Sequence, residues 1–106
     1  MENNTTGSNN VGIGKRAGQT ISSGSQNTII GTNADVAVNN LSNATAIGYG
    51  ANVAASNTIQ LGNTSVTNVK TSGTLTAGSV TYPNTDGTNG YYLKTDGSGT
   101  ASWAGV

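Results

Sequence analysis

Residues 43–51 read NATAIGYGA, and the pattern within them decides the fold. The aliphatic Ile47 is followed by Gly48 and, three residues after this glycine, by the small side chain of Ala51. The same arrangement occurs three more times along the chain. The four repeat glycines are Gly14, Gly31, Gly48 and Gly62, and they are separated by 17, 17 and 14 residues. A spacing this regular indicates a structural repeat.

Within each repeat, apolar residues alternate with small or polar ones, and this period of two is typical of a β-strand. A unit of 14 to 17 residues accommodates two short strands and two turns, so we expect stacked coils of a parallel β-solenoid. The repeat glycines are expected where φ is positive or where another backbone approaches closely, although ordinary turn punctuation is the alternative. We place these aliphatic residues in the core of the solenoid or of a trimer: Val11, Ile13, Ile30, Ile47, Ile59, Leu61, Val69 and Leu75.

The composition favours a fibre over a compact globule. Of 106 residues, 59 are Gly, Thr, Asn or Ser, and only 18 are Leu, Ile or Val. So few large aliphatic side chains cannot offset the ordering of the whole chain, and without Cys or His the remaining remedy is oligomerisation. A disordered linker stays open as an alternative, although the net charge of zero does not favour it.

Three segments carry a family resemblance: residues 9–17 (NNVGIGKRA), residues 43–51 and, more weakly, residues 27–34 (NTIIGTNA). They resemble the head repeats of YadA-like trimeric autotransporter adhesins, over about residues 9–68. The resemblance implies a left-handed parallel β-roll, three chains side by side and attachment of bacteria to host surfaces. The same roll is similar to one in phage tail fibres. The 17-residue spacing exceeds the usual coil of the family.

The last third of the chain has a different pattern. Residues 67–82 predict two short strands with turns at 72–73 and 77–78. The tripeptide Thr-Asp-Gly occurs at 85–87 and again at 95–97, and Asp-Gly between alternating apolar residues is a hairpin signal. We expect residues 91–94 and 100–103 to pair around a turn at 96–99.

Residues 69–106 resemble a module of trimeric phage and phage-like tail fibres and of large bacterial surface proteins. The residues that carry this likeness include Asp86, Gly87, Leu93, Asp96, Gly97 and Trp103, which we take as the turns and core of a neck. The resemblance implies that this neck leads from a repeat region into a following domain.

Several functions are not expected from this sequence. Residues 12–17 match a dinucleotide fingerprint, but no apolar strand precedes them and no helix can follow in a Gly/Ser/Thr-rich segment. The four carboxylates lie in three separate regions and no His is present, so we expect no enzyme, no carboxylate metal site and no cofactor. An axial ion held by a threefold ring of Asn side chains stays open as an alternative, with Asn10, Asn27, Asn43 and Asn57 as candidates. The single basic pair, Lys15 and Arg16, does not predict nucleic-acid binding. No apolar stretch is long enough for a membrane span.

The prediction is therefore an all-β, homotrimeric solenoid with a C-terminal β-hairpin neck. We expect residues 1–8 to be a disordered or added N-terminal segment, 9–68 the repeat region and 69–106 the neck. The expected function is structural and adhesive, in an extracellular fibre such as a tail fibre or injection-system fibre, or in a bacterial surface adhesin. The partners would be two further copies, the rest of a longer fibre and a glycan or protein receptor. Tyr49 is a candidate receptor contact, with packing at a coil edge as the alternative.

Overall fold

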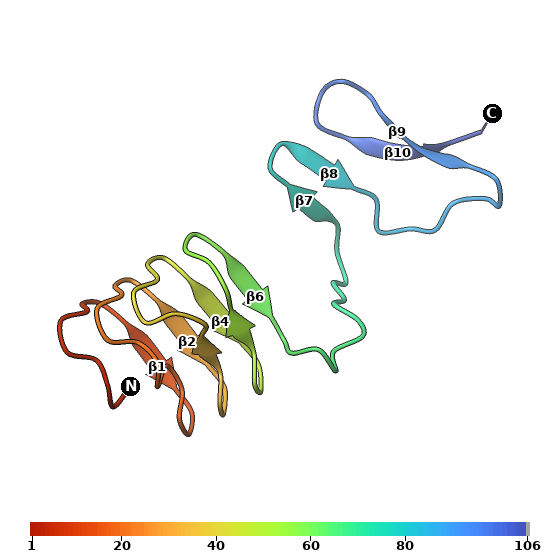
Figure 1. Ribbon diagram of the computed structural model, residues 1–106. Helices are drawn as coiled ribbons and strands as arrows, with labels where there is room; N and C mark the ends of the chain where they lie inside the picture. Colours follow the sequence, from red (N-terminus) through yellow and green to blue (C-terminus); the bar gives the residue numbers. More distant parts are fainter. Residues whose placement is uncertain (106) are drawn as a thin grey trace. The chain divides into compact units, whose positions relative to one another are not determined.

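The computed structural model describes residues 1–105, which form strands, turns and connecting segments without any helix (Figure 1). The prediction of an all-β chain is confirmed for these residues. The strands are β1 (Val11–Ile13), β2 (Thr28–Ile30), β3 (Asp35–Val36), β4 (Thr45–Ile47), β5 (Asn52–Val53), β6 (Ile59–Leu61), β7 (Leu75–Ala77), β8 (Val80–Tyr82), β9 (Tyr92–Thr95) and β10 (Ala101–Ala104). The chain divides into two compact units, an N-terminal unit of Met1–Val69 and a C-terminal unit that begins at Lys70.

The N-terminal unit is built on a parallel sheet in which β1, β2, β4 and β6 lie side by side in that order (Figure 1). Its register pairs Val11 with Thr28, Thr28 with Thr45, and Thr45 with Ile59. These partners are 17, 17 and 14 residues apart, the same spacing as the repeat glycines. A second parallel sheet pairs β3 with β5. The sequence repeat therefore sets the register of the strands.

The repeat glycines Gly31 and Gly48 lie between strands of the two sheets, where consecutive repeats approach closely. Gly31 has φ +132°, and a Cβ added to it would lie 2.6 Å from the carbonyl oxygen of Gly48. Its amide donates to the carbonyl of Ile13 at 2.7 Å, which ties it to the preceding repeat. Only glycine combines this positive φ with so close a backbone neighbour.

Each repeat also has a corner that begins with a serine, in addition to the turn at the repeat glycine. The amide of Ser8 donates to Oγ of Ser25 at 3.0 Å, that of Ser25 to Oγ of Ser42 at 3.3 Å, and that of Ser42 to Oγ of Ser56 at 3.0 Å. The residue after each serine has a positive φ: Asn9, Gln26, Asn43 and Asn57. Asparagine tolerates this conformation better than most residues, so the Ser-Asn pair suits a corner.

Small side chains fill the interior between the two sheets. Ile29 and Ala46 point inward from the first sheet, and Val36 and Val53 from the second, all at most 2% exposed. The other buried members of this cluster are Ala17, Ile21, Ala34, Ala44 and Ala51. Because five of its nine members are alanines, each repeat has a thin interior that needs few large side chains.

The predicted core residues do not fill this interior. In the single chain Val11, Ile13, Ile47, Ile59 and Leu61 are exposed and Ile30 is half-buried. The predicted alternation is thus out of step by one residue, and a shift by one places every side chain of a strand on the opposite face. The predicted core residues Val69 and Leu75 are also exposed. Placement of these residues in the core of a single solenoid is wrong, while their burial between chains stays a prediction.

Residues 1–8 extend the stack by part of a repeat, contrary to the expectation of a disordered segment. The amides of Thr5, Thr6 and Gly7 all donate to the carbonyl of Ser22, at 2.9, 3.0 and 3.2 Å. The amino group of Met1 donates to the carbonyl of Ala17 at 3.1 Å. These residues therefore follow the backbone ladder of the first full repeat.

The stack ends in the fourth repeat because its inward residues are missing. Ala17, Ala34 and Ala51 are buried, whereas Ser65 takes the equivalent place after Gly62. A buried hydroxyl without a partner is costly, and Ser65 instead donates its amide to Oδ1 of Asn63 at 2.8 Å. No strand follows β5 in the second sheet within the described residues.

The C-terminal unit contains two antiparallel hairpins. β7 pairs with β8, and β9 pairs with β10 in a register that sets Trp103 opposite Leu93. Strands β9 and β10 each begin one residue later than the predicted segments. A parallel bridge between Thr81 and Thr100 joins the hairpins, and the amide of Thr81 donates to the carbonyl of Gly99 at 2.7 Å.

Candidate subunit interface

The outward face of the parallel sheet carries a continuous aliphatic row. Ile13 pairs with Ile30, Ile30 with Ile47, and Ile47 with Leu61, so one large aliphatic side chain from each repeat stands in line. Adjacent strands are about 4.8 Å apart, which makes the row about 14 Å long. Ile13 and Leu61, at its two ends, are 58% and 48% exposed.

A second row runs beside the first on the same face. It contains Val11, Thr28, Thr45 and Ile59, which are paired in register. Its end residues are aliphatic and its middle residues are threonines, whose methyl groups keep the centre partly apolar. The two rows together present eight β-branched or Leu side chains and no charge. Soluble monomers rarely leave such a face uncovered.

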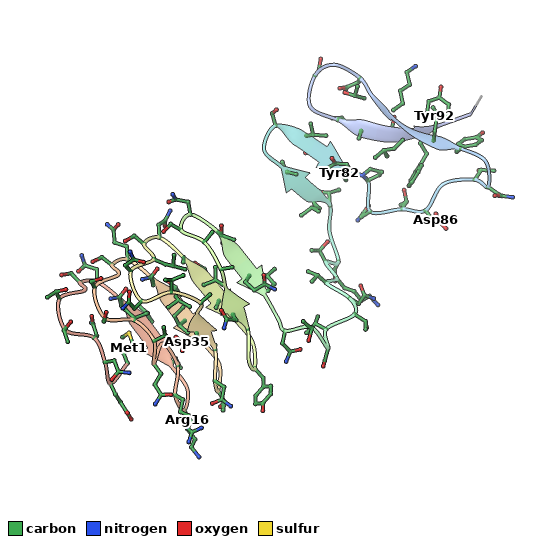
Figure 2. All side chains as sticks on the ribbon, in the orientation of Figure 1. Met1, Arg16, Asp35, Tyr82, Asp86 and Tyr92 are labelled. Carbon is green, nitrogen blue, oxygen red and sulfur yellow. The ribbon has the colours of Figure 1, made fainter. Side chains whose placement is uncertain are left out.

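Charged residues of the N-terminal unit lie elsewhere. Lys15 and Arg16 lie in the turn after β1, and Figure 2 shows Arg16 pointing away from the strands. Asp35 is in the second sheet, where its carboxylate accepts hydrogen bonds from the Thr20 amide at 3.0 Å and hydroxyl at 2.7 Å. Burial of the aliphatic face would therefore not require any of these charged groups to lose its water.

Tyr49 lies outside the aliphatic face. It follows Gly48 in the turn after β4 and is 67% exposed. Its carbonyl accepts a hydrogen bond from Nδ2 of Asn63 at 2.7 Å, which fixes the backbone that carries the ring. The structure therefore presents Tyr49 as an exposed aromatic side chain on an ordered turn.

Three of the residues predicted for a neck, Asp86, Gly87 and Leu93, come together around Trp103. Its Nε1 donates to the carbonyl of Thr85 at 2.7 Å, and a Cβ on Gly87 would lie 2.7 Å from the indole Cδ2. Leu93 lies opposite Trp103 in the hairpin. Asp86 accepts a hydrogen bond from the amide of Gly87 at 2.8 Å, which shapes the segment beneath the ring.

The second Thr-Asp-Gly copy forms the hairpin turn. The carboxylate of Asp96 accepts hydrogen bonds from the amides of Ser98 at 2.7 Å and Thr100 at 3.1 Å. These bonds, that of Ser98 first, hold the pKa of Asp96 below its ordinary value because they favour the ionised form. Gly97 has φ +78°, as the turn requires. The two copies thus have different structural roles.

Asn27, expected from the sequence only as one of four candidates for an axial ion, is fully buried and has a structural role within its own chain. Its Nδ2 donates to the carbonyl of Leu41 at 2.7 Å, and its Oδ1 accepts from the amide of Ala44 at 3.0 Å. Asn10 makes equivalent bonds one repeat earlier, to Gly24 and Asn27. Asn27 lies 17 residues after Asn10, the same spacing as that of Gly14 and Gly31, and this spacing is the sequence signal that could have indicated its structural role.

Within residues 1–105, no three His, Cys, Asp or Glu residues lie close enough together to hold a metal ion. The same part of the chain has no helix with the length and apolar character to cross a membrane. Comparisons with protein-family models, with curated proteins and with solved structures found no match.

Proposed function

We propose that this chain is a structural and adhesive segment of an extracellular homotrimeric fibre. In this proposal the N-terminal unit is a β-solenoid, or β-roll, and three copies of it pack around a common axis. The C-terminal unit is the neck that leads into the rest of the fibre. The stacked backbone ladder would stiffen the rod, while its polar outer surface makes weak contacts multiplied by threefold avidity.

The observation that carries the proposal is the in-register row of Ile13, Ile30, Ile47 and Leu61. The interior of the single chain is already filled by alanine, valine and isoleucine, so this row has no partner within its own repeat stack. Burial of a large aliphatic side chain contributes about 2 kcal/mol when complete. The row presents one aliphatic side chain per repeat, so a partner with the same strand spacing along the stack can contact every one of them. Another copy of this chain has that spacing.

Threefold symmetry and the surface location come from the resemblance to adhesin heads and tail fibres. Among carriers, we favour a tail fibre or phage-like injection-system fibre, on the pattern of Asp86, Gly87, Leu93 and Trp103. A bacterial surface adhesin is the alternative, supported by the NATAIGYGA-type repeats. Both carriers would use the segment for attachment to a cell surface.

The solution mass tests the proposal. Sedimentation or light scattering over a roughly hundredfold dilution should give the mass of three chains, because a hydrophobic interface this extensive resists dissociation. A single-chain mass together with a folded spectrum would overturn the trimeric fibre. A random-coil circular dichroism spectrum, unchanged on heating, would instead favour the disordered linker.

A further inference from the structure

A groove lined by uncharged residues lies at the end of the repeat stack, where the second sheet lacks a strand after β5. It has a volume of about 370 Å³ and is lined by Gly50, Asn52, Gln60, Gly62, Asn63 and Thr64. These residues come from β5, from β6 and from the turns that follow β4 and β6. None of them belongs to the outward rows of the first sheet, so a trimer formed through those rows would leave the groove open.

The chemistry of this lining selects one class of ligand. Every lining side chain is neutral, so the groove offers no formal charge to a phosphate, a carboxylate or a cation. Three of the six lining residues carry amides, which offer donor and acceptor together and match the vicinal hydroxyl groups of a sugar. The groove has no aliphatic side chain for a lipid to contact.

The side-chain amides of the groove differ in how many of their hydrogen-bonding atoms the fold already uses. Asn63 is used by the fold, because its Nδ2 donates to Tyr49 and its Oδ1 accepts from Ser65. Gln60 donates its Nε2 to the carbonyl of Gly62 at 3.1 Å, and its Oε1 accepts no hydrogen bond within residues 1–105. The amide of Asn52 is exposed and makes no side-chain hydrogen bond within residues 1–105, so both its donor and its acceptor are available.

Tyr49 directly precedes Gly50, a lining residue, and carries an exposed aromatic side chain. Its backbone is held to Asn63, a lining residue, by the 2.7 Å bond, and its side chain is 67% exposed. An aromatic ring next to neutral amides is a suitable platform for the apolar face of a sugar ring. We propose that this groove, together with the exposed Tyr49 on the adjoining turn, binds a neutral oligosaccharide, and this inference rests on the proposed adhesive function.

The experiment uses the full chain on a printed array of neutral and sialylated oligosaccharides. Neutral glycans should be captured, and Asn52→Ala and Tyr49→Ala should each weaken capture by about tenfold, while Tyr49→Phe retains most of it. Asn40→Ala removes an exposed amide outside the groove and should bind like the wild type. Capture of sialylated glycans only, no capture, or equal binding by all four variants would overturn the proposal.

A second measurement covers the case in which a variant fails to fold. Addition of a captured neutral oligosaccharide to ¹⁵N-labelled wild-type chain should shift the amide signals of Gly50, Asn52, Gln60 and Asn63. Shifts confined to other residues would overturn the groove as the site. The solution mass separates this failure from that of the fibre proposal, because a trimer that binds no glycan retains its mass of three chains.

Discussion

The indole of Trp103 lies over Gly87, in a position that leaves no room for a side chain there. A Cβ on Gly87 would come within 2.7 Å of Cδ2 and 2.8 Å of Cγ. The Nε1 bond to Thr85 holds the ring in place from the same segment. Residues 85–87 and β10 are therefore joined by one aromatic contact, which requires glycine at position 87.

We expect Gly87→Ala to destabilise the C-terminal unit by about 1 to 3 kcal/mol, because the ring must move and strain its hydrogen bond. Trp103 is the only tryptophan, so its fluorescence reports on this contact directly. The emission should shift to longer wavelength and its thermal transition should fall. Gly73→Ala is the control, since nothing lies within 4 Å of a Cβ there. Equal transitions for the two variants would contradict the contact.

The hairpin between β9 and β10 should lose stability in acid. The amides of Ser98 and Thr100 hold the pKa of Asp96 below its ordinary value. A depressed folded pKa contributes stability that is present above the unfolded pKa and is lost as the pH falls through the folded pKa. Amide exchange of Ser98 and Thr100 should therefore speed up, beyond its intrinsic pH trend, below about pH 4. Asp96→Asn should flatten this dependence, and an unchanged profile in that variant would exclude Asp96 as its source.

Gly31→Ala should disrupt the repeat stack more than an ordinary glycine substitution. A positive φ alone costs an L-residue about 1 kcal/mol, and here the added Cβ also meets the carbonyl of Gly48 at 2.6 Å. Gly50→Ala is the matched control, because Gly50 has φ +63° but its nearest neighbour would be 3.6 Å away. We expect a loss of roughly 3 kcal/mol or more for Gly31→Ala and about 1 kcal/mol for the control. Thermal unfolding by circular dichroism measures both, and equal losses would mean that the neighbouring repeat yields.

Asn27→Ala should destabilise the N-terminal unit by roughly 3 kcal/mol or more, since the carbonyl of Leu41 and the amide of Ala44 lose buried partners. Asn40→Ala, at an exposed position, should change the stability by less than about 0.5 kcal/mol. Urea unfolding followed by circular dichroism compares the two. Similar midpoints would show that water replaces the Asn27 amide.

The sequence predicted what depends on local pattern. The spacing of Gly14, Gly31, Gly48 and Gly62 gave the register of the parallel sheet, and the Asp96-Gly97 turn gave the last hairpin to within one residue. Each of these features is fixed by a few adjacent residues whose backbone conformation has a clear residue preference.

The sequence could not show which side of each strand faces inward. In β2 both Ile29 and Ile30 are aliphatic, so alternation does not decide which of them is buried. The prediction places inside the aliphatic residue that directly precedes each repeat glycine, such as Ile30. In the structure, the residue one position earlier faces the interior, which is thin enough to be filled by alanine, as the fully buried Ala46 of β4 shows. The contact of Trp103 with Gly87 was equally hidden, since it joins residues 16 apart through a turn whose path the pattern did not specify.

The opposite faces of β4 give the sharpest test of the proposed interface, because Ile47 points out and Ala46 points in. Ile47 is 40% exposed in the single chain, so Ile47→Asp should change the stability of that chain by no more than about 1 kcal/mol. In a trimer the same substitution would bury three carboxylates near one axis, and we expect the mass to fall from three chains to one while the β-sheet spectrum persists. Ala46 is fully buried, so Ala46→Asp should abolish the β-sheet spectrum itself.

Lys15→Ala combined with Arg16→Ala controls for surface substitution in general, since both residues are exposed in a turn outside the aliphatic rows. This double variant should keep the mass of three chains and the wild-type melting temperature. Ile47→Asp with the mass and melting temperature of the wild type would show that the aliphatic row is not the contact between chains. Dissociation of the Lys15/Arg16 variant would instead place that turn in the contact, because charge removal at a solvated turn leaves an aliphatic interface intact.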